Sequence, residues 1–324
     1  MRSARRNMVA VLTAVAAMAF LPQSTGVGQT ARGEHPITIA AIPEIVEAGM
    51  QWKQVWSGTD DADGIVGAAD GSAIFAQRAV NRVRKVDVTG NTSVVVANTD
   101  AAGSLAIDYQ GRILAVLRDH PSVAMLTPEH KVLTDNYYGA KFKGAADLVV
   151  EKRGGMYITE SRRNPWPGVY YLAPDGKMFS FGDGIRANGI ALSPDEKTLY
   201  VSNRDNIVII ELRPDGTGSN NRHESEKLQG TGVNGDGMTV DSAGRVYVST
   251  QTGVQILTPD GKFIGQIPSP RIVTSVAFAG PEKKTLFIIT RGAKEPNGAE
   301  STADTARTIY ALPVVAQGYT GRAK

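Results

Sequence analysis

The sequence predicts an all-β fold, a six-bladed β-propeller with four antiparallel strands in each blade. Two observations predict it. A segment of two short apolar strands around a Gly- or Pro-containing turn occurs six times, at intervals of about 38 to 48 residues. A second strand–turn–strand pattern alternates with the first over the same stretch. A lone hairpin has too little core to be stable, so we expect the hairpins to pack as blades around a common axis.

The composition fits one large soluble domain. The chain has 324 residues, of which 42% are hydrophobic and 21% charged. The formal net charge is only +3, and no dense basic cluster is interleaved with aromatic residues, so we expect no nucleic-acid partner. The absence of cysteine excludes disulfides, thiolate catalysis and thiolate metal ligands.

The chain begins with a pattern typical of export. Three arginines, Arg2, Arg5 and Arg6, precede an apolar run over residues 8–21, which is short for a membrane span. We therefore expect a signal peptide over residues 1–21, with a buried core helix as the alternative. A Gly-, Ser- and Thr-rich stretch over 22–36 predicts a disordered leader. The mature protein is then expected in the periplasm or outside the cell, with no membrane attachment.

The repeats divide residues 37–324 into the blades of a single domain. The first-type segments begin at Ile65, Leu105, Leu148, Ile190, Met238 and Val276. The second-type segments begin at Val83, Val123, Val169, Ile207, Val254 and Thr308. The stretch 51–56 (QWKQVW) lies just before the first repeat and is expected to add a strand to the last sheet. Because a ring closed in this way needs no partner chain, we expect a monomer.

Polar residues occur at the same phase of several repeats. The first strand of a propeller blade lies nearest the axis, so the residues entering these strands face one mouth of the central channel. Two positions directly precede the first apolar residue of each of these strands. In blade order, the first of the two holds Asp63, Gly103, Ala146, Asn188, Asp236 and Thr274. The next position holds Gly64, Ser104, Asp147, Gly189, Gly237 and Ser275. The symmetry therefore gathers oxygen-bearing side chains from distant parts of the chain, namely Asp63, Asp147, Asn188 and Asp236.

Such a cluster favours a bound cation. Bunched carboxylates repel one another unless a cation or a proton joins them. Oxygen donors without His or Cys favour a hard ion, so calcium is expected first, with magnesium, manganese or zinc possible. We predict Asp63, Asn188 and Asp236 as the metal ligands. The alternative is that these residues simply form turns, since Asp-Gly and Asn-Gly are ordinary turn pairs.

Four segments resemble blades of the gluconolactonase family, which includes senescence marker protein (regucalcin). ANGIALSPDEKTLYVSN, GDGMTVDSAGRVYVST and VTSVAFAGPEKKTLFIIT are similar to its fourth, fifth and sixth blades, and ADLVVEKRGGMYITE is similar to its third. The resemblance covers about residues 51–318. It implies a six-bladed propeller, one divalent metal, usually calcium, and hydrolysis of a lactone or similar ester.

The metal-site motifs of that family match only in part. Asn188 and Asp236 match directly. Asp63 stands where the family has a Glu, and Ala146 stands where it has an Asn, so that only Asp147 of an Asn-Asp pair is retained. The resemblance therefore implies a metal site with one shortened and one missing polar side chain.

These residues suggest roles in catalysis. We expect Asp236 to act as ligand and general base, with Asp147 the second candidate base. His120, Thr274 and Ser275 are candidate substrate contacts, although His120 is also typical of a solvated loop. The predicted function is an exported, metal-dependent hydrolase acting on a small-molecule lactone. A non-catalytic binding propeller, favoured by Ala146, and a different propeller enzyme such as a lyase or phosphotriester hydrolase are the alternatives.

Overall fold

The fold is known from a computed structural model, which describes residues 33–162, 168–230 and 233–322. The expected signal peptide over 1–21 and most of the expected leader over 22–36 lie outside the described residues. The part of the chain from Arg32 onward forms one compact unit. Within the described residues, no helix is long and apolar enough to cross a membrane.

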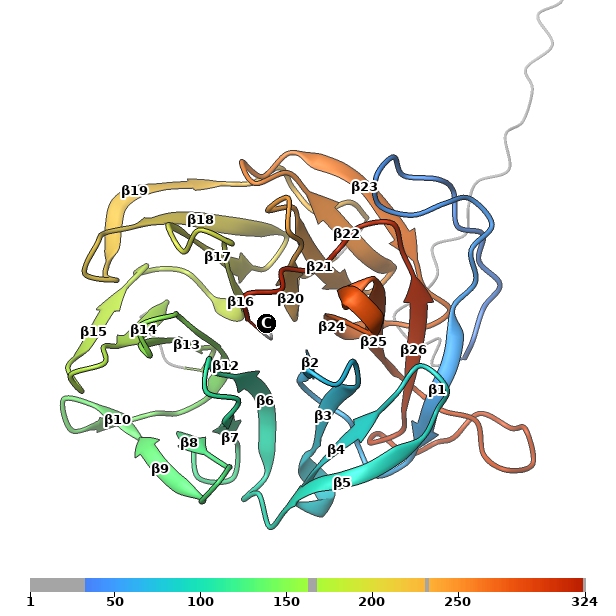
Figure 1. The fold of residues 1–324 in the computed structure, drawn as a ribbon, viewed down its shortest axis with the longest axis horizontal. Helices are drawn as coiled ribbons and strands as arrows, with labels where there is room; N and C mark the ends of the chain where they lie inside the picture. Colours follow the sequence, from blue (N-terminus) through green and yellow to red (C-terminus); the bar gives the residue numbers. More distant parts are fainter. Residues whose placement is uncertain (1–32, 163–167, 231–232, 323–324) are drawn as a thin grey trace, which may run out of the picture. The chain divides into compact units, whose positions relative to one another are not determined.

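Five blades follow one another along the chain, each a four-stranded antiparallel sheet (Figure 1). Blade one contains β2 (Ile65–Gly67), β3 (Ala73–Gln77), β4 (Arg82–Val86) and β5 (Thr92–Ala97). Blade two contains β6 (Ala102–Ile107), β7 (Ile113–Leu117), β8 (Ser122–Met125) and β9 (Lys131–Thr134). Blade three contains β12 (Ala145–Val150), β13 (Met156–Glu160), β14 (Val169–Leu172) and β15 (Met178–Phe181). Blade four contains β16 (Ala187–Leu192), β17 (Thr198–Asn203), β18 (Asn206–Leu212) and β19 (Gly218–Glu224). Blade five contains β20 (Met238–Val240), β21 (Val246–Thr250), β22 (Gly253–Leu257) and β23 (Phe263–Pro268).

The sixth blade closes the ring with a strand from the other end of the domain. It contains β24 (Val273–Ala279), β25 (Thr285–Arg291), β26 (Arg307–Pro313) and, at its outer edge, β1 (Lys53–Gly58). Strand β1 pairs antiparallel with β26, Gln54 opposite Tyr310 and Ser57 opposite Thr308. The predicted six blades and the closing N-terminal strand are both confirmed.

Short elements lie between the blades. A two-stranded hairpin, β10 (Asn136–Tyr137) and β11 (Ala140–Lys141), connects blades two and three. The 3₁₀ turns η1 (Arg78–Val80) and η2 (Pro281–Lys283) are the only helical elements in the described ranges.

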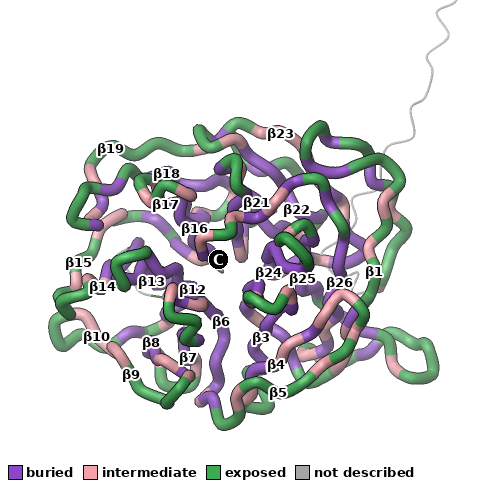
Figure 2. The backbone as a smooth tube through the Cα atoms, in the orientation of Figure 1, coloured by how far each residue is buried: buried purple, intermediate pink, exposed green. Residues whose placement is uncertain are grey.

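The hydrophobic core consists of six clusters, each between neighbouring blades. Between blades three and four, for example, Tyr171 of β14 packs with Leu199 and Val201 of β17. Buried residues dominate the strands nearest the axis and exposed residues the outer ones (Figure 2). Each blade therefore buries its apolar faces against two neighbours, which holds the inner strands in fixed positions around the axis.

The C-terminal segment lies across one end of the inner strands. Gly318 forms a β-bridge with Asp241, directly after β20, and Lys283 of blade six donates its Nζ to the Tyr319 carbonyl at 2.9 Å. Buried Arg322 donates to the Ser193 carbonyl, just after β16, at 3.0 Å. The polar residues predicted at the mouth lie at the opposite ends of these strands.

Candidate active site

The strands nearest the axis are irregular where the predicted site residues occur. The pairing register shifts between Ala145 and Leu148 in β12, and between Ala187 and Ile190 in β16. Equivalent shifts occur in β6 and β24. A β-bulge inserts an unpaired residue and redirects side chains, and bulges are frequent beside active sites. Asn188-Gly189 is therefore a bulge inside β16 and not a turn, which removes the turn interpretation at this position.

The glycine that follows each of three polar residues lets neighbouring blades approach. A β-carbon on Gly189 would clash with the Asp236 carbonyl oxygen, and one on Gly237 would lie 2.9 Å from Ser275 Oγ. Gly64 packs in the same way against blade two and donates its N–H to the Gly103 carbonyl at 2.7 Å. These glycines are needed for close backbone packing around the axis, since none has the positive φ that favours glycine in turns.

Asn188 and Asp236 are direct neighbours. The Asn188 amide Nδ2 donates to Asp236 Oδ1 at 2.8 Å, joining blades four and five. The other carboxylate oxygen, Oδ2, has no hydrogen-bond partner among the described residues. Enclosure by the protein raises the pKa of Asp236 to about 7, the carboxylates of Asp63 and Asp147 add to this rise, and the guanidinium groups of Arg291 and Arg118 oppose it.

Asp147 is buried and heavily hydrogen-bonded. Its carboxylate accepts hydrogen bonds from Ser104 Oγ of blade two, from Leu148 N at 2.9 Å and from Ile190 N of blade four at 3.1 Å. Asp147 thus links three successive blades. Its carboxylate lies within electrostatic range of Asp236, but its oxygens are engaged by the scaffold.

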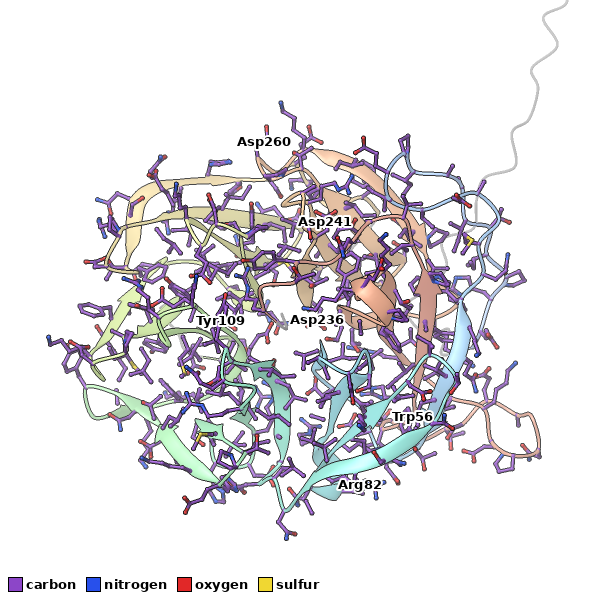
Figure 3. All side chains as sticks on the ribbon, viewed as in Figure 1. Trp56, Arg82, Tyr109, Asp236, Asp241 and Asp260 are labelled. Carbon is purple, nitrogen blue, oxygen red and sulfur yellow. The ribbon has the colours of Figure 1, made fainter. Side chains whose placement is uncertain are left out.

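Asp63 completes the group of acids from blade one. Burial among the surrounding strands raises its pKa, while the guanidinium of Arg118 opposes that rise. Arg118 Nη2 lies 3.6 Å from Asp63 Oδ2. We call the four residues Asp63, Asp147, Asn188 and Asp236 the axial site. The predicted gathering of these residues around the axis is what the structure shows, and Asp236 is labelled beside the axis in Figure 3.

The predicted substrate contacts divide into two groups. Thr274 and Ser275 lie in blade six beside Gly237, and Thr274 Oγ1 donates to the Ile289 carbonyl at 3.4 Å. His120 is different, because its side chain is 83% exposed and its Nδ1 lies 3.3 Å from Asp100 Oδ1. The structure places Thr274 and Ser275 next to the axial site and does not join His120 to it.

The oxygen donors of the axial site decide whether it can hold a divalent cation. In the described part of the chain, no three Asp, Glu, His or Cys side chains are arranged to hold a metal by themselves. The donor set therefore has to include the Asn188 amide oxygen, beside the Asp236 carboxylate. Burial is the main cause of the raised pKa of Asp236, and the charges of Asp63 and Asp147 add to it, so a cation bound here would offset negative charge from three acids. The residues fit a hard, oxygen-preferring cation on these terms.

Two arginines near the axial site were missed from the sequence. Arg118 follows β7 and Arg291 ends β25, and both act electrostatically on Asp236. The two occupy equivalent places, because Ala102 pairs with Leu117 in blade two and Val273 pairs with Thr290 in blade six. Aligning the second strands of the repeats would have shown that the two arginines share a repeat position, but not that Arg118 turns toward the axis.

A separate groove lies away from the axis. Its volume is about 980 Å³, it lies between blades two and three, and its walls include Val132, Tyr138 and Met178. None of the axial residues lines it. The chemistry of the site therefore has to be argued from the axis and not from this groove.

Comparison with known proteins identifies the family. Residues 62–292 match the SMP-30/Gluconolactonase/LRE-like region. The chain belongs to this family. One curated relative is the gluconolactonase of Zymomonas mobilis subsp. mobilis, which is 27% identical over 89% of this chain and 95% of the relative. The 6-deoxy-6-sulfogluconolactonase of Pseudomonas putida is 35% identical over 71% of this chain and 82% of the relative.

Solved structures agree on the fold of the family. A gluconolactonase from Xanthomonas campestris superposes with a TM-score of 0.67 at 23% identity, over 87% of this chain and 99% of that one. Regucalcin, a calcium-binding protein from Agrobacterium tumefaciens, superposes with a TM-score of 0.63 at 17% identity, over 83% of this chain and 95% of that one. At these identities the likeness concerns the propeller architecture. The resemblance noted from the sequence motifs is thus confirmed.

Proposed function

We propose that this chain is an exported, divalent-metal-dependent lactonase, with calcium the first candidate ion and the axial site as its active site. The observation that carries the proposal is the Asn188–Asp236 pair held between blades four and five, with further carboxylates in electrostatic range. Membership of the family and relatives named as lactonases support the reaction class. The basic and apolar start of the sequence supports export to the periplasm or beyond.

Asn188, Asp236 and Asp63 would hold the cation. When bound, a divalent cation polarises the lactone carbonyl and stabilises negative charge on its oxygen. The protein supplies the rigid positions of these donors, because the bulge in β16 and the close packing at Gly189 leave the Asn188 and Asp236 backbones little freedom.

The proton transfers of the reaction fall to the carboxylates. Water adds to the carbonyl carbon, the ring C–O bond breaks, and the ring oxygen leaves as an alcohol, giving a hydroxy acid. Asp236 Oδ2, which has no hydrogen-bond partner in the described part of the chain, is the atom we assign to accept the proton from water and to return it to the ring oxygen as the C–O bond breaks. Asp147 fits the base role less well, because its carboxylate already accepts hydrogen bonds from three blades.

Hydrolysis of a lactone panel tests the proposal. Acid release from the protein would be followed before chelation, after chelation and after calcium is restored, with glucono-1,5-lactone in the panel. We expect activity that disappears with chelator, returns with calcium and is lost in Asp236→Asn. Asp260→Asn is the matched control, because it makes the same change at another Asp-Gly step of blade five, far from the axis in Figure 3. Absence of turnover on every lactone would favour the non-catalytic binding propeller.

A further inference from the structure

Arg118 reaches toward the axial site from an unexpected position. It directly follows β7, and its side chain crosses Gly103 of β6, where a β-carbon would clash with the arginine Nε. The other five blades all have a side chain at the position equivalent to Gly103. The missing side chain in blade two is therefore what lets this arginine turn inward.

The guanidinium of Arg118 is only partly paired. Nη1 donates to the Ala145 carbonyl at 2.8 Å, and Nη2 lies 3.6 Å from Asp63 Oδ2, beyond normal hydrogen-bond distance. Nε is buried without a hydrogen-bond partner. The edge formed by Nε and Nη2 is the one that can bind an oxyanion through two hydrogen bonds. Leaving a buried donor without a hydrogen bond costs free energy. An anion bound at this edge would supply the acceptor that the described residues do not.

Arg291 provides a second cation from the other side of blade one. It occupies the place in blade six that Arg118 occupies in blade two. Its side chain is exposed and has no hydrogen-bond or ion-pair partner among the described residues. Thr290, directly before Arg291, pairs with Val273, and the next two residues of that strand, Thr274 and Ser275, lie against Gly237 beside the axial site.

We propose that Arg118 and Arg291 form a subsite for an anionic group on the substrate, so that the enzyme prefers lactones bearing a carboxylate, sulfonate or phosphate. This inference rests on the lactonase function proposed above. The positive charges of Arg118 and Arg291 offset the acids around the axis, which would otherwise repel an anionic substrate. Arg118 in blade two and Arg291 in blade six flank blade one, which carries Asp63, so the substrate's anion would bind the arginines while its ring carbonyl faces Asn188 and Asp236.

The test uses two lactones that differ in one group. D-glucono-1,4-lactone carries a neutral hydroxymethyl group where D-glucaro-1,4-lactone carries a carboxylate. We expect kcat/KM for the glucaro-lactone to exceed that for the glucono-lactone by about tenfold or more, the effect of one charged hydrogen bond. In Arg118→Gln this preference falls by about tenfold, mainly through the KM of the glucaro-lactone, whereas hydrolysis of the glucono-lactone falls by a smaller factor, because Arg118 also lies beside Asp63.

Three further variants sharpen the result. Arg118→Lys keeps the charge without the two-pronged edge, so it should restore part of the preference. Arg291→Gln changes an exposed side chain and should lower the preference without affecting folding. Arg204→Gln is the control, because Arg204 occupies the equivalent position in blade four, where Ala187 pairs with Asn203, and is exposed. It should leave the preference unchanged.

The outcomes separate this inference from the lactonase proposal. Equal turnover of both lactones by the wild type, or an equal loss on both in Arg118→Gln, would show that Arg118 only neutralises Asp63 and would overturn the subsite. If neither lactone is hydrolysed, calorimetric binding of D-glucaro-1,4-lactone decides. Binding that depends on Arg118 would support the subsite while contradicting the lactonase function, and absence of binding would overturn the subsite.

Discussion

Two aspartates at the two ends of the same short strand have opposite surroundings (Figure 3). Asp236 precedes β20 and Asp241 follows it. Asp241 is fully buried, and its carboxylate accepts hydrogen bonds from Ala243 N, Arg245 N, Arg245 Nε and Tyr247 OH at 2.6 to 3.0 Å. In the described ranges the Asp236 carboxylate has one hydrogen-bond partner, the Asn188 side chain, and Asp63 and Asp147 are negatively charged neighbours.

The difference shows which end of the propeller is built for stability and which for chemistry. The arrangement at Asp241 recurs in blade two, where Asp108 accepts hydrogen bonds from the backbone and Nε of Arg112. Among the described residues no backbone N–H or arginine donates a hydrogen bond to the Asp236 carboxylate, and its pKa is shifted by the nearby acids and arginines. Groups with shifted pKa values and unused hydrogen-bonding capacity concentrate at functional sites. The predictions below follow from this contrast.

Asp241→Asn should produce the largest loss of stability. The change leaves the Arg245 guanidinium, only 14% exposed, without its buried charged partner, so that the exposed Glu44 carboxylate is the acid that still pairs with it. Breaking such a buried pair costs about 3–5 kcal/mol in the free energy of unfolding. Urea unfolding measures this loss, and lactonase activity per folded molecule should stay close to wild type. A variant as stable as wild type would contradict the structural role.

Asp236→Asn should have the reverse effect. We expect kcat/KM to fall on the order of 100- to 1,000-fold, because the change removes a charged group that the transition state requires. The free energy of unfolding should not fall. Steady-state kinetics and urea unfolding on the same preparation measure both quantities. Loss of activity explained wholly by loss of folded protein would show that Asp236 is structural.

The metal-free protein should become less stable as the pH rises from about 4 to 7. The pKa of Asp236 is about 7 in the folded state against a reference value of 3.8, so the folded state retains a proton that the unfolded state has lost. The stability present below pH 4 is therefore lost through this window, by an amount on the order of 2 kcal/mol after solvent screening. Unfolding of chelated protein at several pH values should show this loss relative to Asp236→Asn. Parallel profiles for the two proteins would contradict the shift.

Gly189→Ala should have a smaller effect on activity than Asp236→Asn. The new methyl group would clash with the Asp236 carbonyl oxygen, so the backbone has to shift and displace the carboxylate. We expect activity to fall about tenfold, since small misplacements at a reacting centre are costly, and the free energy of unfolding to fall by about 1–3 kcal/mol. Gly33→Ala is the control, because its β-carbon would lie 4.0 Å from the nearest atom, Glu300 Cγ. Equal activity in the two variants would show that the packing at Gly189 does not position Asp236.

The sequence predicted the blades and the phase of the axial residues because both repeat. Each hairpin carries its own strand and turn signals, and six copies made the position of Asn188 and Asp236 readable. The bulge at Asn188 carries no local signal distinct from an Asn-Gly turn. The inward direction of Arg118 depends on Gly103, a residue on another strand, so no pattern along the chain could predict it.

The different hydrogen bonding of Asp147 and Asp236 was equally hidden. Asp147 and Asp236 stand at neighbouring positions of the repeat, both next to the start of an axial strand, and so both were candidate bases. Only the tertiary contacts show that Ser104 and Ile190 engage the Asp147 carboxylate, from blades two and four. Such contacts join residues far apart in the chain and depend on how the blades pack.

Thermal unfolding with and without calcium tests most directly whether the axial acids are arranged for a cation and not for stability. A ligand that binds only the folded state raises the free energy of unfolding, by about 2.7 kcal/mol when its concentration is a hundred times Kd, and therefore raises Tm. We predict that calcium raises the Tm of the wild type, and that metal-free Asp236→Asn melts at or above metal-free wild type and does not respond to calcium. An Asp236→Asn variant that melts lower than the metal-free wild type, or that responds to calcium equally, would contradict the account.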